Sequence, residues 1–341
     1  KAWAFSSSKY AQEACRNAGT ELKKRYNAGD KVFGDKDGLK RKSPGSPLRT
    51  DYRPELDMSP ELNPTDAAYY QSLIGILRWI CELGRVDCTT EISEMSSCLA
   101  LPREGHLLQL LHIFQCLSAS HNAEVAFGPS YPGIGEAAFP KKGWAGAPHA
   151  QESKGELKEE LPPGRPEPLG LGAAARLHAG SGHAGGKATR APRAGFLASC
   201  SSALTYWHPK KQASIEASSF GSELIALKQA TEYARGLRYA LRVMGARADA
   251  PTYAYAGRQS AIANSSVPDS ALKKKSSSIA FHFAREGSFR DEWRIAYIST
   301  HGNPAGLMTK CLARGVKRAK FVNMLVRYAK SCSAKTISWL H

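Results

Sequence analysis

The stretch SSFGSELIALKQATEYARGLRYALRVM, residues 218–244, decides how the second half of the chain folds. Its apolar residues recur at three- and four-residue steps, which places them along one face of a helix. That face comprises Phe220, Leu224, Leu227, Thr231, Ala234, Leu237, Leu241 and Met244. We therefore predict one long amphipathic helix over this stretch.

Short strand candidates lie on both sides of this helix in the sequence. The strand candidates are residues 193–199, 203–208, 252–256 and 292–299, and further helix patterns cover residues 270–286 and 314–330. Strands that alternate with helices in this order are typical of a mixed α/β domain. The fold class predicted for this half of the chain is therefore α/β.

Two more apolar stripes at helical spacing occur upstream, between residues 66 and 120. The first is Tyr70, Leu73, Ile74, Leu77 and Ile80, and the second is Leu107, Leu110, Leu111, Phe114 and Leu117. Residues 101–105, LPREG, separate the two stripes with a break signal. This region is predicted to form a small helical unit.

The composition between these two regions predicts a linker. Residues 128–175 are rich in Pro, Gly, Lys and Glu, which do not favour regular secondary structure. We therefore expect five segments: an N-terminal helix and loop (1–65), the helical unit (66–127), the linker (128–175), the α/β domain (176–331) and a tail (332–341).

The overall charge of the 341-residue chain favours a polyanionic partner. Lys and Arg number 47 against 30 Asp and Glu, a formal net charge of +17. Counterion release from phosphates makes nucleic acid the expected partner of such a chain. The 8 cysteines show no metal-ligand spacing, and no stretch reaches the ~18 apolar residues that span a bilayer, so we expect neither a disulfide framework nor a membrane segment.

Short segments spread over residues 66–330 carry a family likeness. They are YQSLIG (70–75), GRVD (84–87), LALPREGH (99–106), HAG (183–185), KKQ (210–212), SELIAL (222–227), FHFARE (281–286) and NPA (303–305) followed by TK (309–310). The first three resemble the end of the reverse transcriptase region in copia-type retrotransposon polyproteins. The others, in order, resemble the ribonuclease H domain of that family.

The resemblance implies both a fold and an activity. The fold is a ribonuclease H-like mixed sheet with flanking helices, preceded by a helical unit like the reverse transcriptase thumb or connection. The activity is cleavage of RNA in RNA–DNA hybrids during reverse transcription, with two Mg²⁺ ions held by three Asp and one Glu. Such ions sit roughly 3.5–4 Å apart and need several carboxylates. No pair of polymerase aspartates occurs in the chain, so we expect no DNA synthesis.

One of the four carboxylates that the resemblance implies is present. Glu223 in SELIAL matches the family glutamate, and Glu216 is the weaker candidate. Gly180, Gly257 and Gly306 stand where the three aspartates are expected, and Gly182 stands at the acid next to the first of them. With Glu223 alone as a metal ligand, Mg²⁺ is expected to bind very weakly.

Several alanines accompany the lost aspartates. Ala254, Ala256 and Ala263 stand where strands favour valine. Alanine is a poor strand residue, on a scale that spans ~1 kcal/mol. The pattern indicates drift rather than selection for a new site, and it predicts a weakened sheet.

His282 is the remaining candidate catalytic residue. It matches a family histidine near the scissile site, where it would assist proton transfer or product release. The alternative is a histidine that packs in a helix between Phe281 and Phe283.

Three basic clusters are candidates for contact with phosphates. They are Lys273, Lys274 and Lys275; Arg314, Lys317, Arg318 and Lys320; and Lys23, Lys24 and Arg25. The alternative for each cluster is a solvated helix face.

These observations favour a fragment of a copia-like polyprotein whose ribonuclease H-like domain is inactive. The fragment begins at Lys1 without an initiator Met, and its expected partners are an RNA–DNA hybrid or other nucleic acid and the rest of the polyprotein. The resemblance implies an intracellular location, cytoplasmic or nuclear, and no small-molecule substrate. Three alternatives stay open: a nuclease in which Asp249, Asp269, Asp291 or Glu216 replaces the lost ligands, a binding remnant without catalysis, and a translated relic without function.

Overall fold

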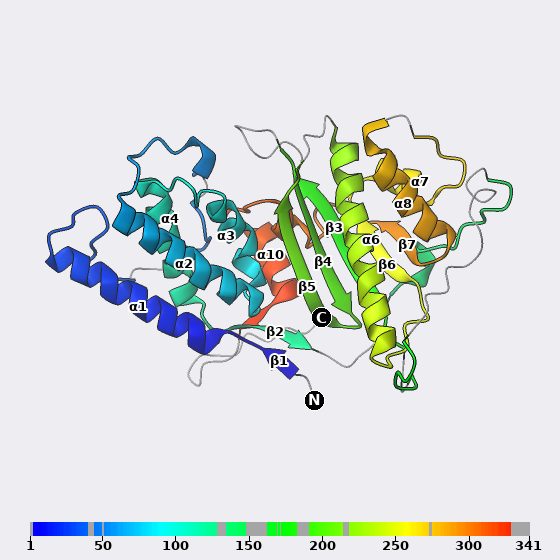
Figure 1. Cartoon of the computed structure of the whole chain (residues 1–341), viewed down its shortest axis with the longest axis horizontal. Coiled ribbons are helices and arrows are strands. Elements are labelled where there is room, and N and C mark those ends of the chain that lie inside the picture. Colours follow the sequence, from blue (N-terminus) through cyan, green and yellow to red (C-terminus); the bar gives the residue numbers. More distant parts are fainter. Residues whose placement is uncertain are drawn as a thin grey trace. The chain divides into compact units, whose positions relative to one another are not determined.

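The computed structural model describes residues 3–39, 44–49, 51–127, 134–147, 162–168, 170, 172–182, 191–213, 218–272 and 275–328. They form two compact units (Figure 1). The helical unit comprises residues 3–126 together with the residues described from 311 onward. The sheet unit comprises the described residues between 127 and 310.

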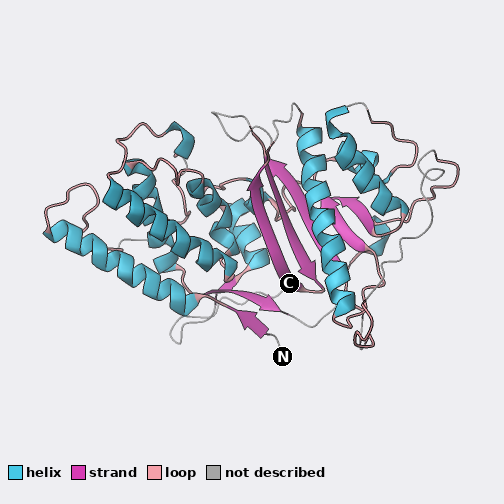
Figure 2. Cartoon of the chain, in the orientation of Figure 1, coloured by secondary structure: helices cyan, strands magenta, loops and turns pink. Residues whose placement is uncertain are grey.

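Helices α1 (Ser8–Asn27), α2 (Pro64–Glu82), α3 (Thr89–Ser96) and α4 (Glu104–Ala119) build the first part of the helical unit (Figure 2). Short 3-10 helices cover Pro54–Leu56 and Val86–Cys88. Helix α2 begins where the side chain of Asn63 accepts a hydrogen bond from the backbone N–H of Asp66 at 2.9 Å. The preceding Pro64 favours the first helical turn, because its missing N–H has no partner there in any case.

Both predicted apolar stripes of this unit are buried. Tyr70, Leu77, Leu107 and Phe114 are inaccessible to solvent, and they share one core with the small residues of α1, such as Ala11. Burial of one apolar face on each of α1, α2 and α4 explains why these helices pack together.

The C-terminal residues complete the helical unit rather than the sheet unit. Helix α10 (Val316–Leu325) contacts the turn at Val86–Cys88, and strand β8 (Arg327–Tyr328) joins a small sheet with β2 (Ala123–Phe127) and β1 (Trp3–Phe5) in the order β1-β2-β8. The sequence places residues 314–330 in the α/β domain, so the described part of that segment differs from the prediction. The reason is a buried side chain on α10, Arg318, whose ion-pair partner belongs to α3.

A five-stranded mixed sheet forms the centre of the sheet unit. Its strands are β3 (Ala175–Gly182), β4 (Arg193–Cys200), β5 (Ala203–Lys211), β6 (Thr252–Ala256) and β7 (Trp293–Tyr297), in the order β5-β4-β3-β6-β7. The pairs β3–β4 and β4–β5 are antiparallel, whereas β3–β6 and β6–β7 are parallel. The predicted α/β class with a mixed sheet and flanking helices is confirmed.

Helices cover one face of this sheet. Helix α6 (Ser219–Val243) crosses it, and α7 (Gln259–Ser266) and α8 (Ser278–Phe289) follow (Figure 1). The short α9 (Gly306–Thr309) lies on the opposite face, since a Cβ atom at Gly195, which alternates with the α6-facing Phe196, would meet Met308. Short 3-10 helices cover Glu136–Ala138 and Lys275–Ser277. Leu227, Ala230 and Ala234 of α6 share a core with Ala254 and Ala256 of β6. The predicted long helix at residues 218–244 is thus present, with its apolar face on the sheet.

The opposite face of the sheet is covered by part of the expected linker. Phe139 is 1% exposed, and its ring meets those of Tyr253 and Tyr255 edge-on at centroid distances of 5.1 and 5.0 Å. Trp144 makes a similar contact with Phe289. Residues 134–147 therefore differ from the linker prediction, because their aromatic side chains bury apolar surface of the sheet.

One further detail differs from the sequence-based expectations. Ala263 lies in α7, a helix that the sequence did not reveal, and not in a strand. The alanines at 254 and 256 do lie in a strand, where both are buried. In the part of the chain that the structure describes, no helix is long and apolar enough to cross a membrane.

Candidate active site

Glu223 is held in the second turn of α6, on the side that faces the sheet. The helix begins at Ser219, and Ser218 caps it by accepting a hydrogen bond from the backbone N–H of Gly221 at 3.3 Å. The side-chain amide of Gln212 donates to the carbonyl of Ser222 at 2.9 Å, which ties the helix start to the end of β5. Glu223 is 8% exposed as a result.

The carboxylate of Glu223 is poorly satisfied for a buried acid. The backbone N–H of Ser181 in β3 donates a hydrogen bond to it, but Oε2 is buried without a partner among the described residues. Burial raises the pKa of Glu223 to about 7, and the positive charges of Arg258 and Lys310 act in the opposite direction. Glu223 is therefore a buried acid with a strongly perturbed pKa, which is a feature of functional sites.

Gly257 lies directly beside this carboxylate. It follows the last residue of β6, and a Cβ atom at this position would lie 3.2 Å from Glu223 Oε1. A carboxylate introduced at Gly257 would thus share one small space with Glu223, after a shift of a few tenths of an ångström in the flexible Glu223 side chain.

Gly180 faces the segment that leads into Gly306. A Cβ atom at Gly180 would meet Asn303 Nδ2 at 3.7 Å and Ala305 Cβ at 3.8 Å, both ordinary contacts. Asn303 is itself fixed to β3, because its side-chain amide donates to the carbonyl of Ala179 at 2.8 Å. Gly306 follows Ala305 and opens α9. Gly180 also precedes Ser181, whose N–H reaches Glu223.

Of the positions that the family likeness singles out, Gly257 lies beside Glu223, and Ser181, the residue after Gly180, hydrogen-bonds to it. Gly180 comes from β3, Gly257 from the end of β6, Gly306 from α9 and Glu223 from α6. Gly182 differs from Gly180, because a Cβ atom there would lie 2.6 Å from the carbonyl oxygen of Thr309. A Cβ atom fits at Gly180 without a clash but not at Gly182.

The residues present do not fit a pair of Mg²⁺ ions. Glu223 is the one carboxylate at the four positions, and within the described ranges no three His, Cys, Asp or Glu side chains form a group that could hold a metal. Arg258 and Lys310 add positive charge near the same carboxylate. Two dications would meet one carboxylate and two cations here, which is unfavourable electrostatically.

Two of the proposed replacement ligands pair with arginines elsewhere. Both oxygens of Asp291 accept hydrogen bonds from Arg294 at 2.8 Å, and Asp249 pairs with Arg247 at 3.0 Å. Asp269 lies in an exposed turn after α7. None of the three joins Glu223 in a metal-type group among the described residues, and Glu216 lies outside them.

His282 lies on the solvent side of α8. Its ring is exposed and meets the ring of Phe281 edge-on at 5.1 Å, while Phe281 itself is buried against Leu224 of α6. The alternative of a packed histidine does not fit this exposure. A role for His282 in proton transfer or product release stays a prediction.

The predicted phosphate-binding residues divide into two kinds. Lys275, Arg314 and Lys320 are exposed, and Lys317 is half-buried with its ammonium 5.8 Å from the centroid of the Phe321 ring. Arg318, however, is 6% exposed and pairs with Glu91 at 2.6 Å, so it is unavailable to a phosphate. Lys273 and Lys274 lie outside the described residues.

The sequence did not single out the two cations that influence Glu223. Arg258 directly follows Gly257, and Lys310 closes the TK motif, so their places beside two motif positions were the available signal. Both side chains belong to exposed residues. No known protein-family model matches the chain, so a functional assignment depends on its residues and their geometry.

Proposed function

We propose that the chain is a fragment of a copia-like retrotransposon polyprotein, in which the end of the reverse transcriptase precedes a ribonuclease H-like domain without catalytic activity. One observation carries most weight: Gly257, identified by motif order, lies beside the buried Glu223, and Ser181, the residue after Gly180, hydrogen-bonds to the same carboxylate. The five-stranded mixed sheet, with Glu223 on the sheet-facing side of a long helix, supports the same assignment.

The chemistry of the site explains the proposed loss of activity. The ancestral reaction would cut RNA in an RNA–DNA hybrid by attack of water on a phosphate, which needs metal ions to activate the water and stabilise the leaving oxygen. The positions of the three lost aspartates offer a metal no ligand, because glycine has no side chain. Glu223 alone neither neutralises nor orients such ions.

A non-catalytic nucleic-acid-binding remnant is the second candidate. Arg258 and Lys310 favour it, because they leave a net positive charge around a site that lacks its carboxylates. Its partners would be an RNA–DNA hybrid or other nucleic acid and the rest of the polyprotein, in the cytoplasm or the nucleus. The alternative of a relic without function predicts a broad unfolding transition instead of a cooperative one.

Cleavage of an RNA–DNA hybrid tests the proposal. The natural chain is compared with a variant that carries Gly180→Asp, Gly257→Asp and Gly306→Asp, with and without Mg²⁺. We expect no cleavage by the natural chain and Mg²⁺-dependent cleavage by the variant. Adding Glu223→Gln to the three substitutions is the matched control and should abolish the restored activity. Cleavage by the natural chain that Glu223→Gln removes would refute the proposed loss of activity.

A further inference from the structure

The last described segment of the chain returns to the helical unit after the whole sheet unit. We call residues 311–328 the C-terminal clasp; it comprises α10, β8 and the residues that lead into them. Phe321 is inaccessible to solvent, and Val322 and Val326 are 7% and 3% exposed. The clasp therefore buries an apolar face as well as adding a strand.

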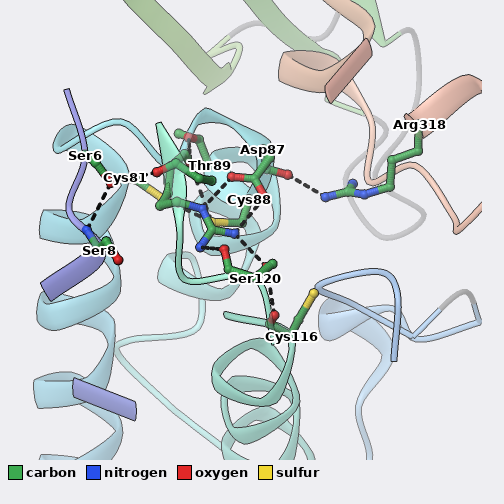
Figure 3. A network of polar contacts seen from close by, with 11 residues as sticks. Ser6, Ser8, Cys81, Asp87, Cys88, Thr89, Cys116, Ser120 and Arg318 are labelled. Carbon is green, nitrogen blue, oxygen red and sulfur yellow. Dashed lines mark hydrogen bonds and ion pairs between the residues drawn. The ribbon is translucent and has the colours of Figure 1, made fainter. Parts of the chain in front are cut away.

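Arg318 anchors the clasp through two contacts, one with α3 and one with the 3-10 turn at Val86–Cys88 that precedes it. Its Nη1 lies 2.6 Å from Glu91 Oε1, and these side chains are 7% and 3% exposed. Its Nη2 donates to the backbone carbonyl of Asp87, and Figure 3 shows the Arg318 side chain extended toward Asp87. A carboxylate as deeply buried as that of Glu91 is strongly unfavourable without such a partner.

Asp87, whose carbonyl accepts from Arg318, is itself held in place by an ion pair with Arg85. Arg85 donates to both oxygens of the Asp87 carboxylate at 2.8 Å, and also to the carbonyl oxygen and the hydroxyl of Ser120 at 2.9 and 3.1 Å. The carboxylate of Asp87 is thus satisfied by Arg85, while its carbonyl oxygen faces Arg318 (Figure 3). Residues 3–126 contribute every one of these receiving groups.

The backbone adds a second mode of attachment. Strand β8 pairs antiparallel with β2, with Arg327 opposite Glu124 and Tyr328 opposite Ala123. An extended segment that adds to a sheet edge gains main-chain hydrogen bonds, while the side chains before it supply specificity.

We propose that residues 3–126 form an acceptor site for the C-terminal clasp, a basic helix followed by an edge strand, and that this contact holds the two halves of the chain together once the connection between them is cut. The occupant is a segment of the same chain, recognised by Arg318 in the pocket of Glu91 and the Asp87 carbonyl. This inference does not depend on the proposed nuclease ancestry. It predicts that proteolysis between the helical and sheet units leaves a non-covalent pair of fragments.

Controlled cleavage of the folded full-length chain tests the proposal. A specific protease site is inserted after Gly128, ahead of residues 134–147, so that the sheet unit stays in one fragment. The purified chain is cut, and the fragments are separated by size-exclusion chromatography. We expect the two fragments to elute together. An excess of a free peptide with the sequence of residues 311–328 should then release the N-terminal fragment from its partner.

Matched variants identify the anchor. The peptide with Arg318→Glu should compete at least about 30-fold more weakly, because its new carboxylate would be buried beside the carboxylate of Glu91. The peptide with Lys320→Glu carries the same charge change at an exposed position and should compete like the natural one. Since competition uses the natural chain, the result does not depend on whether a variant chain folds. Separation of the natural fragments on cutting, or equal competition by both variant peptides, would overturn the proposal.

Discussion

Glu223 is a buried carboxylic acid, and its environment accounts for its chemistry. Desolvation disfavours its charged form, while the N–H of Ser181 and the charges of Arg258 and Lys310 offset only part of that penalty. Gly257, where the family resemblance expects an aspartate, lies directly beside it. Under the proposed ancestry, Glu223 is the remaining member of a metal-ligand set.

The perturbed pKa predicts a specific pH dependence of stability. The pKa of Glu223 is raised from 4.5 to about 7 in the folded chain, so the folded chain holds this proton more tightly than the unfolded chain does. The stabilisation is complete below pH 4.5 and is lost as the pH rises through 7. We expect the free energy of unfolding to fall by about 3 kcal/mol over that range, and Glu223→Gln to remove this fall.

Urea unfolding at a series of pH values measures this effect as the difference between the natural chain and the variant. The control is Glu232→Gln, on the same helix, where the side chain is 55% exposed and pairs with Lys228. A difference between natural chain and Glu223→Gln that stays constant from pH 4 to pH 8 would show that Glu223 ionises normally.

Motif order identified Glu223 and the three glycine positions, but not the cations around them. In the structure, Gly257 and Ser181, the residue after Gly180, lie at Glu223, although all three are far apart in the sequence. The burial of a single charged residue is not visible in a basic run. Arg318 lies in such a run, yet its role depends on Glu91, 227 residues away in the sequence.

At the scale of helices and strands, apolar spacing predicted the long elements well. Helix α6 and strands β4 and β6 occur within a few residues of their expected bounds. Helix α7 was missed because its apolar face is short and it contains several small and polar residues. The cover of the second sheet face by residues 134–147 was missed because isolated aromatics in a Pro/Gly-rich segment show no periodicity.

Packing between α8 and β7 predicts a sensitive glycine. A Cβ atom at Gly287 would lie 2.0 Å from Cζ2 of Trp293, whose indole N–H donates to the carbonyl of Ala284 at 3.0 Å. Gly287→Ala forces the buried indole to move and should lower the free energy of unfolding by about 1–3 kcal/mol.

Gly236 on α6 is the matched control for this substitution. It lies inside a helix, and a Cβ atom there meets nothing within 4 Å. Gly236→Ala should therefore stabilise the chain by about 0.5–1 kcal/mol, because alanine loses less backbone freedom on folding. Denaturant unfolding of both variants measures the pair, and equal effects would contradict the packing described for Trp293.

At the scale of the whole molecule, the net charge of +17 predicts salt-sensitive binding to nucleic acid. If Arg258 and Lys310 contact phosphates, replacing both by Gln should weaken binding to an RNA–DNA hybrid. The slope of log affinity against log salt concentration should fall by about 2. Fluorescence anisotropy at several salt concentrations measures both quantities.

The matched control removes two charges elsewhere in the sheet unit. Lys142→Gln with Arg247→Gln changes the net charge equally at exposed positions away from the motif residues. Identical slopes for the two double variants would mean that binding senses overall charge and not the surroundings of Glu223.

Metal binding by the restored site tests most directly the central claim that these four positions are the remains of a metal centre. Mn²⁺ is titrated into the natural chain, into the variant with Gly180→Asp, Gly257→Asp and Gly306→Asp, and into that variant with Glu223→Gln, and free Mn²⁺ is followed by electron paramagnetic resonance. We predict saturable binding by the restored variant, weaker binding once Glu223 is replaced, and no saturable binding by the natural chain. Saturable binding by the natural chain, or none by a restored variant that unfolds cooperatively, would contradict the account.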